Sequence, residues 1–249
     1  MEVLNSDNMG KVSIIIPVHN IIQRGYKRVR HSVLSLQPQM DYIDEIIIVD
    51  SSDKVQYDML HELIKEYVVN HIHIPLYCFN KPKLLNTGIK ETKSKYIMCT
   101  DSDYIFAKDF LYYCSKYRSE KTILHKQVKM LPSMKINDSN VLEWHFPKSP
   151  VNKWGKLANG ACQYATREFF IHNPYPEEMD GFSAMDNMMT YMAYNKGLTP
   201  HWITESEILH QHHNIVNKMG GSNRKKFDRN QAMLQAYINS NNLPCLLTK

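Results

Sequence analysis

Short apolar runs alternate with amphipathic segments through the first hundred residues of the chain. The apolar runs cover residues 12–17, 43–49, 72–79 and 96–100. Apolar side chains recur at helical spacing in the intervening segments 26–37, 57–69 and 84–92. Runs rich in β-branched residues are typical of strands buried on both faces of a sheet, and Pro17 should end the first one because proline cannot donate to the ladder. This alternation predicts an α/β fold with a doubly wound, mostly parallel sheet.

Two carboxylates follow the last of these predicted strands, in the tripeptide Asp101-Ser102-Asp103. Ligands of an open α/β sheet bind just outside the carboxyl ends of its strands. Carboxylates gathered there lose hydration energy unless a cation compensates them, and Mg²⁺ or Mn²⁺ can do so while it keeps coordination positions for phosphate. Alone, the triplet would more often be a solvated turn. After a buried strand it indicates a divalent-metal site that carries a diphosphate.

Several motifs in a fixed order resemble one known family. The chain resembles the family 2 glycosyltransferases of the GT-A fold, the fold of nucleotide-diphospho-sugar transferases, in the segments VSIIIPVHN, IDEIIIVDSSD, LLNTGIKETKSKYIMCTDSD and GFSAMDNMM. The resemblance extends from about Val12 to His213. It implies a nucleotide-sugar site at the carboxyl edge of the strands, a UDP-sugar as donor, and Mn²⁺ or Mg²⁺ as cofactor.

The resemblance also implies roles for single residues. Asp50 would read the base edge of uracil, Asp101 would face the ribose or the sugar, and Asp103 would bind the metal. Lys83, like Lys81, is a cation that could contact the phosphates. The expected donor-site residues are Pro17, Asn20, Asp50, Lys83, Asn86, Asp101 and Ser102.

A further metal ligand is expected after Trp202, in the segment Ile208 to His213. By resemblance His210 is the best candidate, because it directly follows the apolar run. His212 and His213 remain alternatives, since a metal site needs only some of three closely spaced histidines and the others would then support it or lie at the surface.

The acceptor side resembles chondroitin-polymerase-like and galactosyltransferase-like members over residues 159–187. Phe182, Ser183 and Met185 stand where those members have tryptophan, glycine and glutamate, so the departure concerns the acceptor and not the chemistry. Asp186, which matches the catalytic base, is retained. The departure also leaves open a catalytically inactive module that only binds nucleotide-sugars.

Asp186 is of the residue type that inverting sugar transfer requires. A carboxylate must take the proton from the acceptor nucleophile as it attacks the anomeric carbon opposite the leaving nucleotide. Asp186 lies at the start of a predicted helix over 184–195, where the helix dipole favours a negative charge. The alternative is a helix N-cap without a catalytic role. Met188, Met189 and Met192 on this helix are predicted to pack into the core.

Composition limits the remaining possibilities. The chain has 249 residues, 43% of them hydrophobic, which is enough for one sizeable core. We expect a single domain over 1–249, with a nucleotide-sugar half at about 11–128, an acceptor half at about 129–213 and a basic C-terminal loop and helix at 214–249. Residues 129–154 are predicted to be mainly loop, because they lack periodicity and contain three prolines.

Charge and cysteine content bear on partners and location. The formal net charge of +5 suits acidic ligands, and the basic stretch 218–229 could close over a diphosphate as a lid or, less favoured, contact nucleic acid. The five cysteines show no disulfide or zinc spacing, and no apolar stretch reaches membrane-spanning length. We therefore expect a cytoplasmic protein without a membrane span.

Together these features predict an inverting, metal-dependent glycosyltransferase. It would move a sugar from a nucleotide-diphospho-sugar to a hydroxyl acceptor, in the first place a saccharide. A macromolecular acceptor, either a modified DNA base or a protein side chain, is the alternative.

Overall fold

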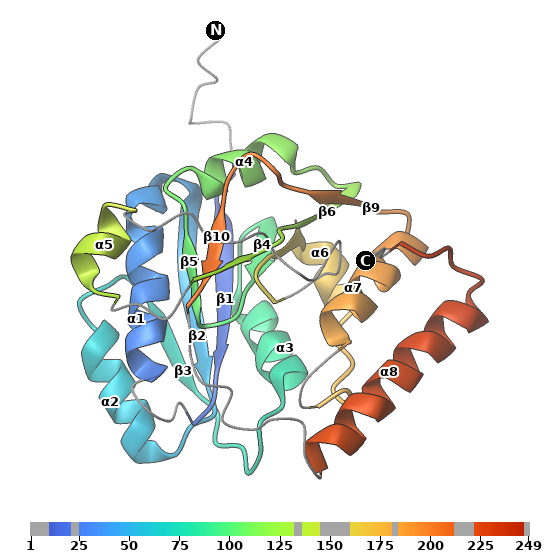
Figure 1. Cartoon of the computed structure of the whole chain (residues 1–249), viewed down its shortest axis with the longest axis horizontal. Coiled ribbons are helices and arrows are strands. Elements are labelled where there is room, and N and C mark those ends of the chain that lie inside the picture. Colours follow the sequence, from blue (N-terminus) through green and yellow to red (C-terminus); the bar gives the residue numbers. More distant parts are fainter. Residues whose placement is uncertain are drawn as a thin grey trace, which may run out of the picture.

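The computed structural model describes residues 10–20, 25–131, 136–144, 160–180, 184–211 and 222–246. A seven-stranded sheet forms the centre of this part of the chain, and Figure 1 shows helices packed around it. Its strands are β1 (Val12–Val18), β2 (Ile43–Asp50), β3 (Asn70–His73), β4 (Tyr96–Cys99), β6 (Thr122–His125), β8 (Gln163–Thr166) and β9 (Thr199–Trp202). They lie in the order β3-β2-β1-β4-β8-β6-β9.

Most neighbours in this sheet are parallel, which confirms the predicted fold class. β1 pairs in parallel with β2 and β4, β2 with β3, and β6 with β9. β8 is antiparallel to both of its neighbours, β4 and β6. The parallel half therefore comes from the part of the chain where apolar runs and helical segments alternate.

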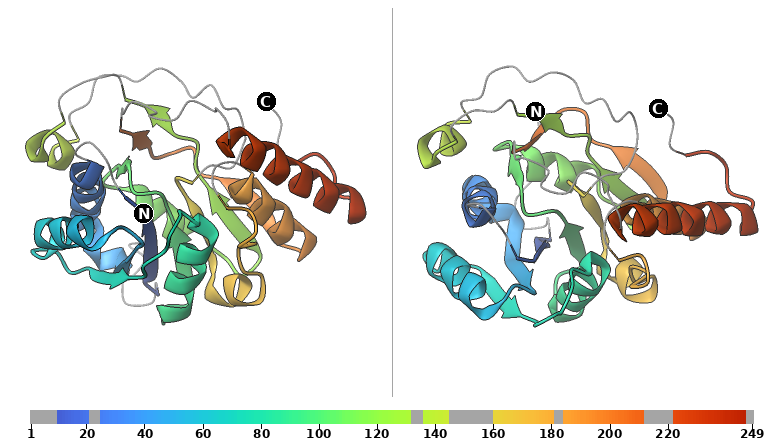
Figure 2. Two further views of the ribbon diagram at one scale, coloured as in Figure 1. Left: turned by 90° about the horizontal axis from the view of Figure 1, so that it is seen from below. Right: turned by 60° about the horizontal axis from the view of Figure 1, so that its bottom comes forward.

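Helices cover both faces of the sheet, as Figure 2 shows. They are α1 (Gly25–Leu36), α2 (Lys54–Ile64), α3 (Lys81–Glu91), α4 (Phe110–Tyr117), α5 (Asp138–Leu142), α6 (Arg167–His172), α7 (Met185–Asn195) and α8 (Ser222–Ser240), with a 3-10 helix η2 (Gln37–Tyr42) after α1. Alternate residues of a strand point to opposite faces. Ile14 and Ile16 accordingly pack in a core with α1, α2 and α4, whereas Ile15 packs in a second core with α3, α6 and α7.

Pro17 and Gly88 show how single residues are accommodated in the parallel half of the sheet. Pro17 lies within β1 and pairs only with β2, because the β4 ladder ends at Ile15 opposite Cys99. The strand therefore continues one residue past the proline, to Val18, instead of ending at it. Gly88 lets α3 approach β1 closely, since a Cβ at this position would lie 2.5 Å from Cγ2 of Ile15.

A small second sheet brings distant segments together. It consists of β5 (Tyr104–Phe106), β10 (Ile208–His210) and β7 (Lys129–Met130), in the order β5-β10-β7. β10 is antiparallel to β5, with His210 opposite Tyr104. This register places the end of β10 beside the residues that precede β5.

Three segments differ from the sequence predictions. The predicted strand 72–79 is the shorter and earlier β3, which ends at His73. The predicted loop region 129–154 contains β7 and α5. Helix α5 begins with a capping box between Asn137 and Asn140. Residues 132–135 and 145–154 of this region lie outside the described residues. In the basic stretch, the residues from Ser222 onward belong to α8.

Candidate active site

Lys81 joins two of the predicted site carboxylates at the carboxyl edge of the sheet. Its Nζ lies 2.6 Å from Oδ1 of Asp101 and 3.2 Å from Oδ1 of Asp186. Asp101 follows β4 and Asp186 lies in the first turn of α7, so the lysine links two segments 85 positions apart in sequence (186 − 101). Lys81 itself is in the first turn of α3, where Asn80 caps the helix through the Lys83 backbone N–H.

Burial and the neighbouring charges shift the pKa values of Asp101 and Lys81. Burial raises the pKa of Asp101 to about 6, the nearby carboxylates of Asp186 and Asp103 add to the rise, and the Lys81 ammonium opposes it. Burial acts against the charge on Lys81, but its two carboxylate partners outweigh burial and raise its pKa. The lysine therefore stays protonated and compensates charges that would otherwise repel each other.

Gly160 lies directly against Asp101. The backbone N–H of Asp101 donates to the Gly160 carbonyl over 2.7 Å. A Cβ added to Gly160 would lie 1.9 Å from Oδ2 of Asp101, which is far below any van der Waals separation. The absence of a side chain at position 160 therefore makes room for the Asp101 carboxylate.

Asp103 and His210 form a second pair, which the register of the small sheet creates. Nε2 of His210 lies 3.3 Å from Oδ2 of Asp103, and the backbone N–H of Gln211 donates to the Asp103 carbonyl over 2.9 Å. Burial acts to lower the pKa of His210, but Asp103 and then Asp101 outweigh it and raise the pKa. Both side chains are about one fifth exposed, so solvent and ligands can reach them.

The Asp103 and His210 side chains are compatible with Mn²⁺ as metal ligands. A carboxylate oxygen and an imidazole nitrogen face each other, and Mn²⁺ accepts both ligand types, whereas Mg²⁺ prefers oxygen. Among the described residues, no group of three or more histidine, cysteine, aspartate or glutamate side chains is placed to hold a metal ion. A metal at Asp103 and His210 would therefore take its remaining ligands from outside these side chains.

Hydrogen bonds fix the turn that carries Asp186. Its carbonyl accepts from Nε2 of Gln163 over 2.7 Å and from Oγ1 of Thr190 over 3.1 Å. Tyr175 donates from its hydroxyl to Oε1 of Gln163. Ala184 caps the helix in a left-handed conformation with φ of 68°, an arrangement that costs energy for a residue with a Cβ and is therefore imposed by its surroundings.

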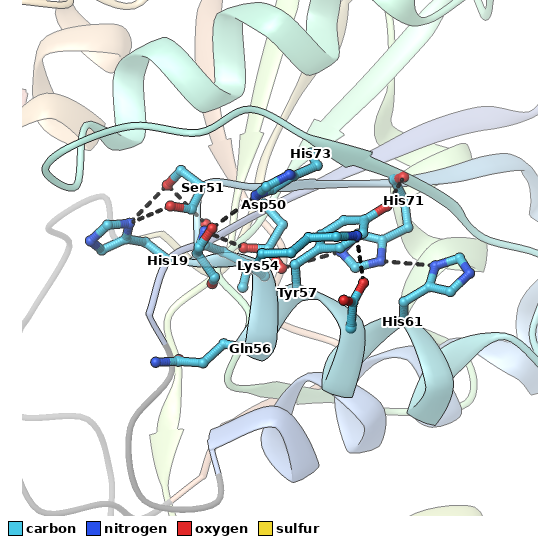
Figure 3. A network of polar contacts seen from close by, with 12 residues as sticks. His19, Asp50, Ser51, Lys54, Gln56, Tyr57, His61, His71 and His73 are labelled. Carbon is cyan, nitrogen blue, oxygen red and sulfur yellow. Dashed lines mark hydrogen bonds and ion pairs between the residues drawn. The ribbon is translucent and has the colours of Figure 1, made fainter.

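The carboxyl end of β2 carries the predicted base-reading residue. Asp50 is fully buried, its Oδ1 accepts from the Ser52 backbone N–H over 2.7 Å, and its Oδ2 lies 3.2 Å from Nε2 of His71. Asn20 lies beside this segment, because its backbone N–H donates to Oγ of Ser52 and its side chain accepts from the Asp53 backbone N–H. Figure 3 shows Asp50 and the histidines around it.

Comparison with known proteins gives one family and a set of similar folds. Residues 13–122 match the sequence profile of Glycosyl transferase family 2. Over these 110 of its 249 residues (122 − 13 + 1), the chain is similar to that family. Comparison with curated protein sequences gives no match.

Similar solved structures support the fold assignment. A crystal structure of S. aureus TarS has a TM-score of 0.62 and 13% identity, covering 92% of this chain and 39% of TarS. GalNAc-T7 with UDP, GalNAc and Mn²⁺ has a TM-score of 0.65 and 16% identity, covering 91% of this chain and 48% of GalNAc-T7. S. aureus TarS 1-349 in complex with UDP-GlcNAc has a TM-score of 0.61 and 15% identity, with 92% and 66% covered. These likenesses identify the GT-A fold, and this chain spans only 39 to 66% of the length of the chains it resembles.

The structure brings some of the predicted residues together and separates others. Asp101 and Asp186 meet at Lys81, and Ser102 lies between Asp101 and the Asp103 that pairs with His210. Lys83 is exposed on α3, on the side away from the buried Lys81. The amide of Asn86 is buried, donates to the Tyr175 carbonyl and accepts from the Tyr175 backbone N–H, and these bonds hold that segment. The predicted site roles stay predictions at this stage.

The remaining predictions concern residues outside the described ranges, the methionines of α7 and the membrane span. His212, His213, Phe182 and Ser183 lie outside the described residues, as does Lys218. The predicted core role of the methionines on α7 is confirmed, because Met188 and Met189 are buried and Met192 packs against the same clusters. The described residues include no helix that could span a membrane.

Sequence reasoning gave too little weight to Lys81, Gln163 and Tyr175. Lys81 could have been preferred over Lys83, because it directly follows an asparagine and precedes a proline, and this Asn-Lys-Pro order predicts a helix that begins at Lys81. A lysine in that first turn lies at the edge of the sheet. Gln163 and Tyr175 carry no such signal, since their importance comes from contacts across the fold.

Proposed function

We propose that this protein is a glycosyltransferase that moves a sugar from a nucleotide-diphospho-sugar, in the first place a UDP-sugar, to a hydroxyl acceptor with inversion at the anomeric carbon. The observation that carries the proposal is the meeting of Asp101 and Asp186 at Lys81, next to the Asp103 and His210 pair. These residues would supply a proton acceptor, a cation and a pair of metal ligands at one edge of the sheet. A base can take the proton of the acceptor, and a cation or a metal can neutralise the charge on a diphosphate leaving group.

The donor class is supported by the similar structures. TarS 1-349 was solved with UDP and with UDP-GlcNAc, and GalNAc-T7 with UDP, GalNAc and Mn²⁺. The buried Asp50 and the adjacent Asn20 lie at the ends of β2 and β1, where the family resemblance puts the nucleoside. A uridine diphosphate is the nucleotide that we assign to this edge.

Asp186 is the residue that we assign as the general base. Its Oδ1 faces the Lys81 ammonium, which leaves Oδ2 as the oxygen for the proton of the acceptor hydroxyl. The bonds from Gln163 and Thr190 to its carbonyl hold the turn, so the carboxylate keeps one direction while the proton moves. A base fixed in this way contributes roughly 10²- to 10⁴-fold to a transfer rate.

Asp103 and His210 are the side chains that would hold the divalent metal. Mn²⁺ bound there would neutralise charge on the departing diphosphate. Lys81 would add a second positive charge on the same side of the reaction. Asp101, held by Lys81 and given room by Gly160, would contact the ribose or the sugar of the donor.

The test is release of nucleotide from a panel of nucleotide-sugars, incubated with the purified chain and Mn²⁺, with and without simple saccharide acceptors. We expect slow, Mn²⁺-dependent hydrolysis of one UDP-sugar, since water can replace the acceptor. Asp186→Asn should lower turnover by roughly 10²- to 10⁴-fold and leave the dissociation constant for UDP unchanged. Product analysis by NMR should show an inverted anomeric configuration.

The matched control is Asp58→Asn, the same change at an exposed carboxylate of α2 that pairs with Lys54. It should leave turnover unchanged. Near-normal turnover of Asp186→Asn would remove Asp186 from the mechanism, and a product of retained configuration would refute the inverting reaction.

A further inference from the structure

A cluster of histidines lies on the outer side of the sheet, apart from the metal pair described above. His71 and His73 belong to the edge strand β3, and His61 belongs to α2, which packs beside it. Figure 3 shows Tyr57 of α2 lying along these rings. The tyrosine ring stacks on His71 with centroids 4.2 Å apart and lies 4.4 Å from the centroid of His73.

The buried carboxylate of Asp50 fixes the tautomer of His71. The side chain of His71 is only 2% exposed, and its Nε2 lies 3.2 Å from Oδ2 of Asp50. A carboxylate oxygen accepts hydrogen bonds, so Nε2 carries the ring hydrogen and the neutral ring has its lone pair at Nδ1. A carboxylate that orients a histidine in this way is a common arrangement behind metal-binding imidazoles.

The lone pair of His71 points at a second imidazole. Nδ1 of His61 lies 3.3 Å from Nδ1 of His71, and the two rings are inclined by only 17° with centroids 5.5 Å apart. Two imidazole nitrogens that bind one tetrahedral Zn²⁺ at about 2.0–2.1 Å each are about 3.3 Å apart. The observed separation therefore suits a shared metal ion without movement of the backbone.

Access and ligand type also favour a metal at this position. His61 lies at the surface, so an ion and its water ligands can enter from solvent, while Tyr57 holds the buried ring of His71 in place. Imidazole pairs bind Zn²⁺, Cu²⁺ and Ni²⁺ in preference to Mn²⁺ and Mg²⁺. This preference separates the site from the Asp103 and His210 pair, which includes a carboxylate.

We propose that Nδ1 of His61 and Nδ1 of His71 form a binding site for a transition-metal ion of the Zn²⁺, Cu²⁺ or Ni²⁺ type, backed by Asp50 and completed by water. The ion would link α2 to the edge strand β3. The proposal concerns the protein without donor or acceptor, so it stands or falls independently of the proposed sugar transfer.

Titration of the full-length protein with Zn²⁺ and with Ni²⁺, followed by calorimetry, tests the site. We expect His61→Ala to weaken binding at one site at least about tenfold. His61 lies at the surface, so this variant should fold. The matched control is His172→Ala, an exposed histidine at the end of α6, which should bind as the wild type does.

Electron paramagnetic resonance of one equivalent of Cu²⁺ identifies the ligands directly. We expect coupling to two imidazole nitrogens in the wild type and in His210→Ala, and to fewer in His61→Ala. Unchanged Zn²⁺, Ni²⁺ and Cu²⁺ binding in His61→Ala would overturn the proposal. Binding that is lost in His210→Ala and kept in His61→Ala would overturn it as well, because the metal would then belong to the other site.

Discussion

Lys81 is the residue on which the charge balance of the candidate site depends. Two carboxylates, of Asp101 and Asp186, share its ammonium within 3.2 Å. A buried ion pair adds little net stability compared with apolar packing, but removal of one partner leaves the others without compensation. Lys81 is therefore expected to matter for folding as well as for the proposed reaction.

Replacement of Lys81 should show how much its charge contributes to folding stability. Lys81→Met keeps an unbranched side chain that is one atom shorter but removes its charge. The two carboxylates then repel each other, and we expect a loss of about 1–3 kcal/mol in the free energy of unfolding at pH 7. Urea denaturation measures it. The double variant Lys81→Met with Asp101→Asn should lose less than the sum of the single changes, because the second change removes one of the two repelling charges.

Lys83→Met on the same helix is the matched control. The side chain of Lys83 is exposed, so the change should alter stability by less than about 0.5 kcal/mol. If Lys81→Met were equally mild, the lysine would not compensate the carboxylates in solution.

The same two lysines show what could be predicted about single residues. The Asp101 to Asp103 tripeptide and Asp186 stood out in the sequence because of their motifs, and the structure places Asp101 and Asp186 on one cation. The choice between Lys81 and Lys83 depended on which side of α3 faces the sheet, and sequence motifs alone did not settle it. Asn86 belongs to a motif, yet its amide bonds the backbone of Tyr175, a contact between residues 89 positions apart.

At the scale of elements, α8 is attached to the rest of the molecule by a defined ion cluster. Asp180 lies 2.5 Å from Nζ of Lys226 and also contacts the guanidinium of Arg229, and α8 packs on α7 through Leu234, Met185 and Met188. Two residues of the basic stretch are thus already paired with a carboxylate. The lid and nucleic-acid roles of that stretch stay predictions and gain no support from these contacts.

The ion cluster predicts a pH-dependent attachment of α8. Burial acts to raise the pKa of Asp180, but Lys226 and Arg229 outweigh it and hold the pKa below its usual value. A carboxyl with a lowered pKa in the folded state contributes stability above its unfolded pKa of about 3.9 and loses it as the pH falls through the lowered value. Asp180→Asn should therefore weaken α8 attachment by about 1 kcal/mol at pH 7, and this difference should disappear as the pH falls through the lowered pKa of Asp180.

Amide hydrogen exchange of α8, compared between wild type and variant at each pH, measures this difference. Asp228→Asn is the control, since Asp228 pairs with Arg224 on the exposed side of the same helix. Equal protection of α8 in wild type and Asp180→Asn at pH 7 would show that apolar packing alone holds the helix.

Helices and strands with a clear local sequence pattern could be predicted, and those without one could not. β1, β2, β4, α1, α2, α3 and α7 follow from β-branched runs and helical spacing, with ends that differ by a few residues. α5 was missed because five helical residues are too few for a periodic pattern, although its Asn137 capping box is a local signal. The antiparallel β8 was not predicted, because its neighbours β4 and β6 are distant in sequence.

At the scale of the whole molecule, the candidate metal pair depends on long-range topology. Asp103 follows the parallel half of the sheet, whereas His210 ends β10 more than a hundred residues later. Only the antiparallel register of β5 and β10 puts them 3.3 Å apart. Sequence motifs named both residues by resemblance, but the pairing of their strands lies beyond local patterns.

Binding of UDP and Mn²⁺ to the whole chain should show that the metal needs both Asp103 and His210. UDP at 100 times its dissociation constant stabilises the folded state by about 2.7 kcal/mol, and Mn²⁺ should lower that dissociation constant further. Asp103→Asn and His210→Ala should each abolish the Mn²⁺ increment in the thermal melting temperature while the metal-free effect of UDP persists. His172→Ala serves as control. A full Mn²⁺ increment in His210→Ala would transfer the ligand role to another residue.

The contact between Gly160 and Asp101 sets the mutational tolerance of position 160. Because even a methyl group there would overlap the Asp101 carboxylate, every substitution at this position should displace the proposed sugar-contacting oxygen. Gly10 has open space around it, so alanine should be accepted there. In a library that carries every single substitution and is selected for transfer activity, position 160 should return glycine alone. Recovery of active Gly160→Ala clones at the frequency of Gly10→Ala would show that Asp101 can move without loss, and homologous enzymes would then be free to vary at this site.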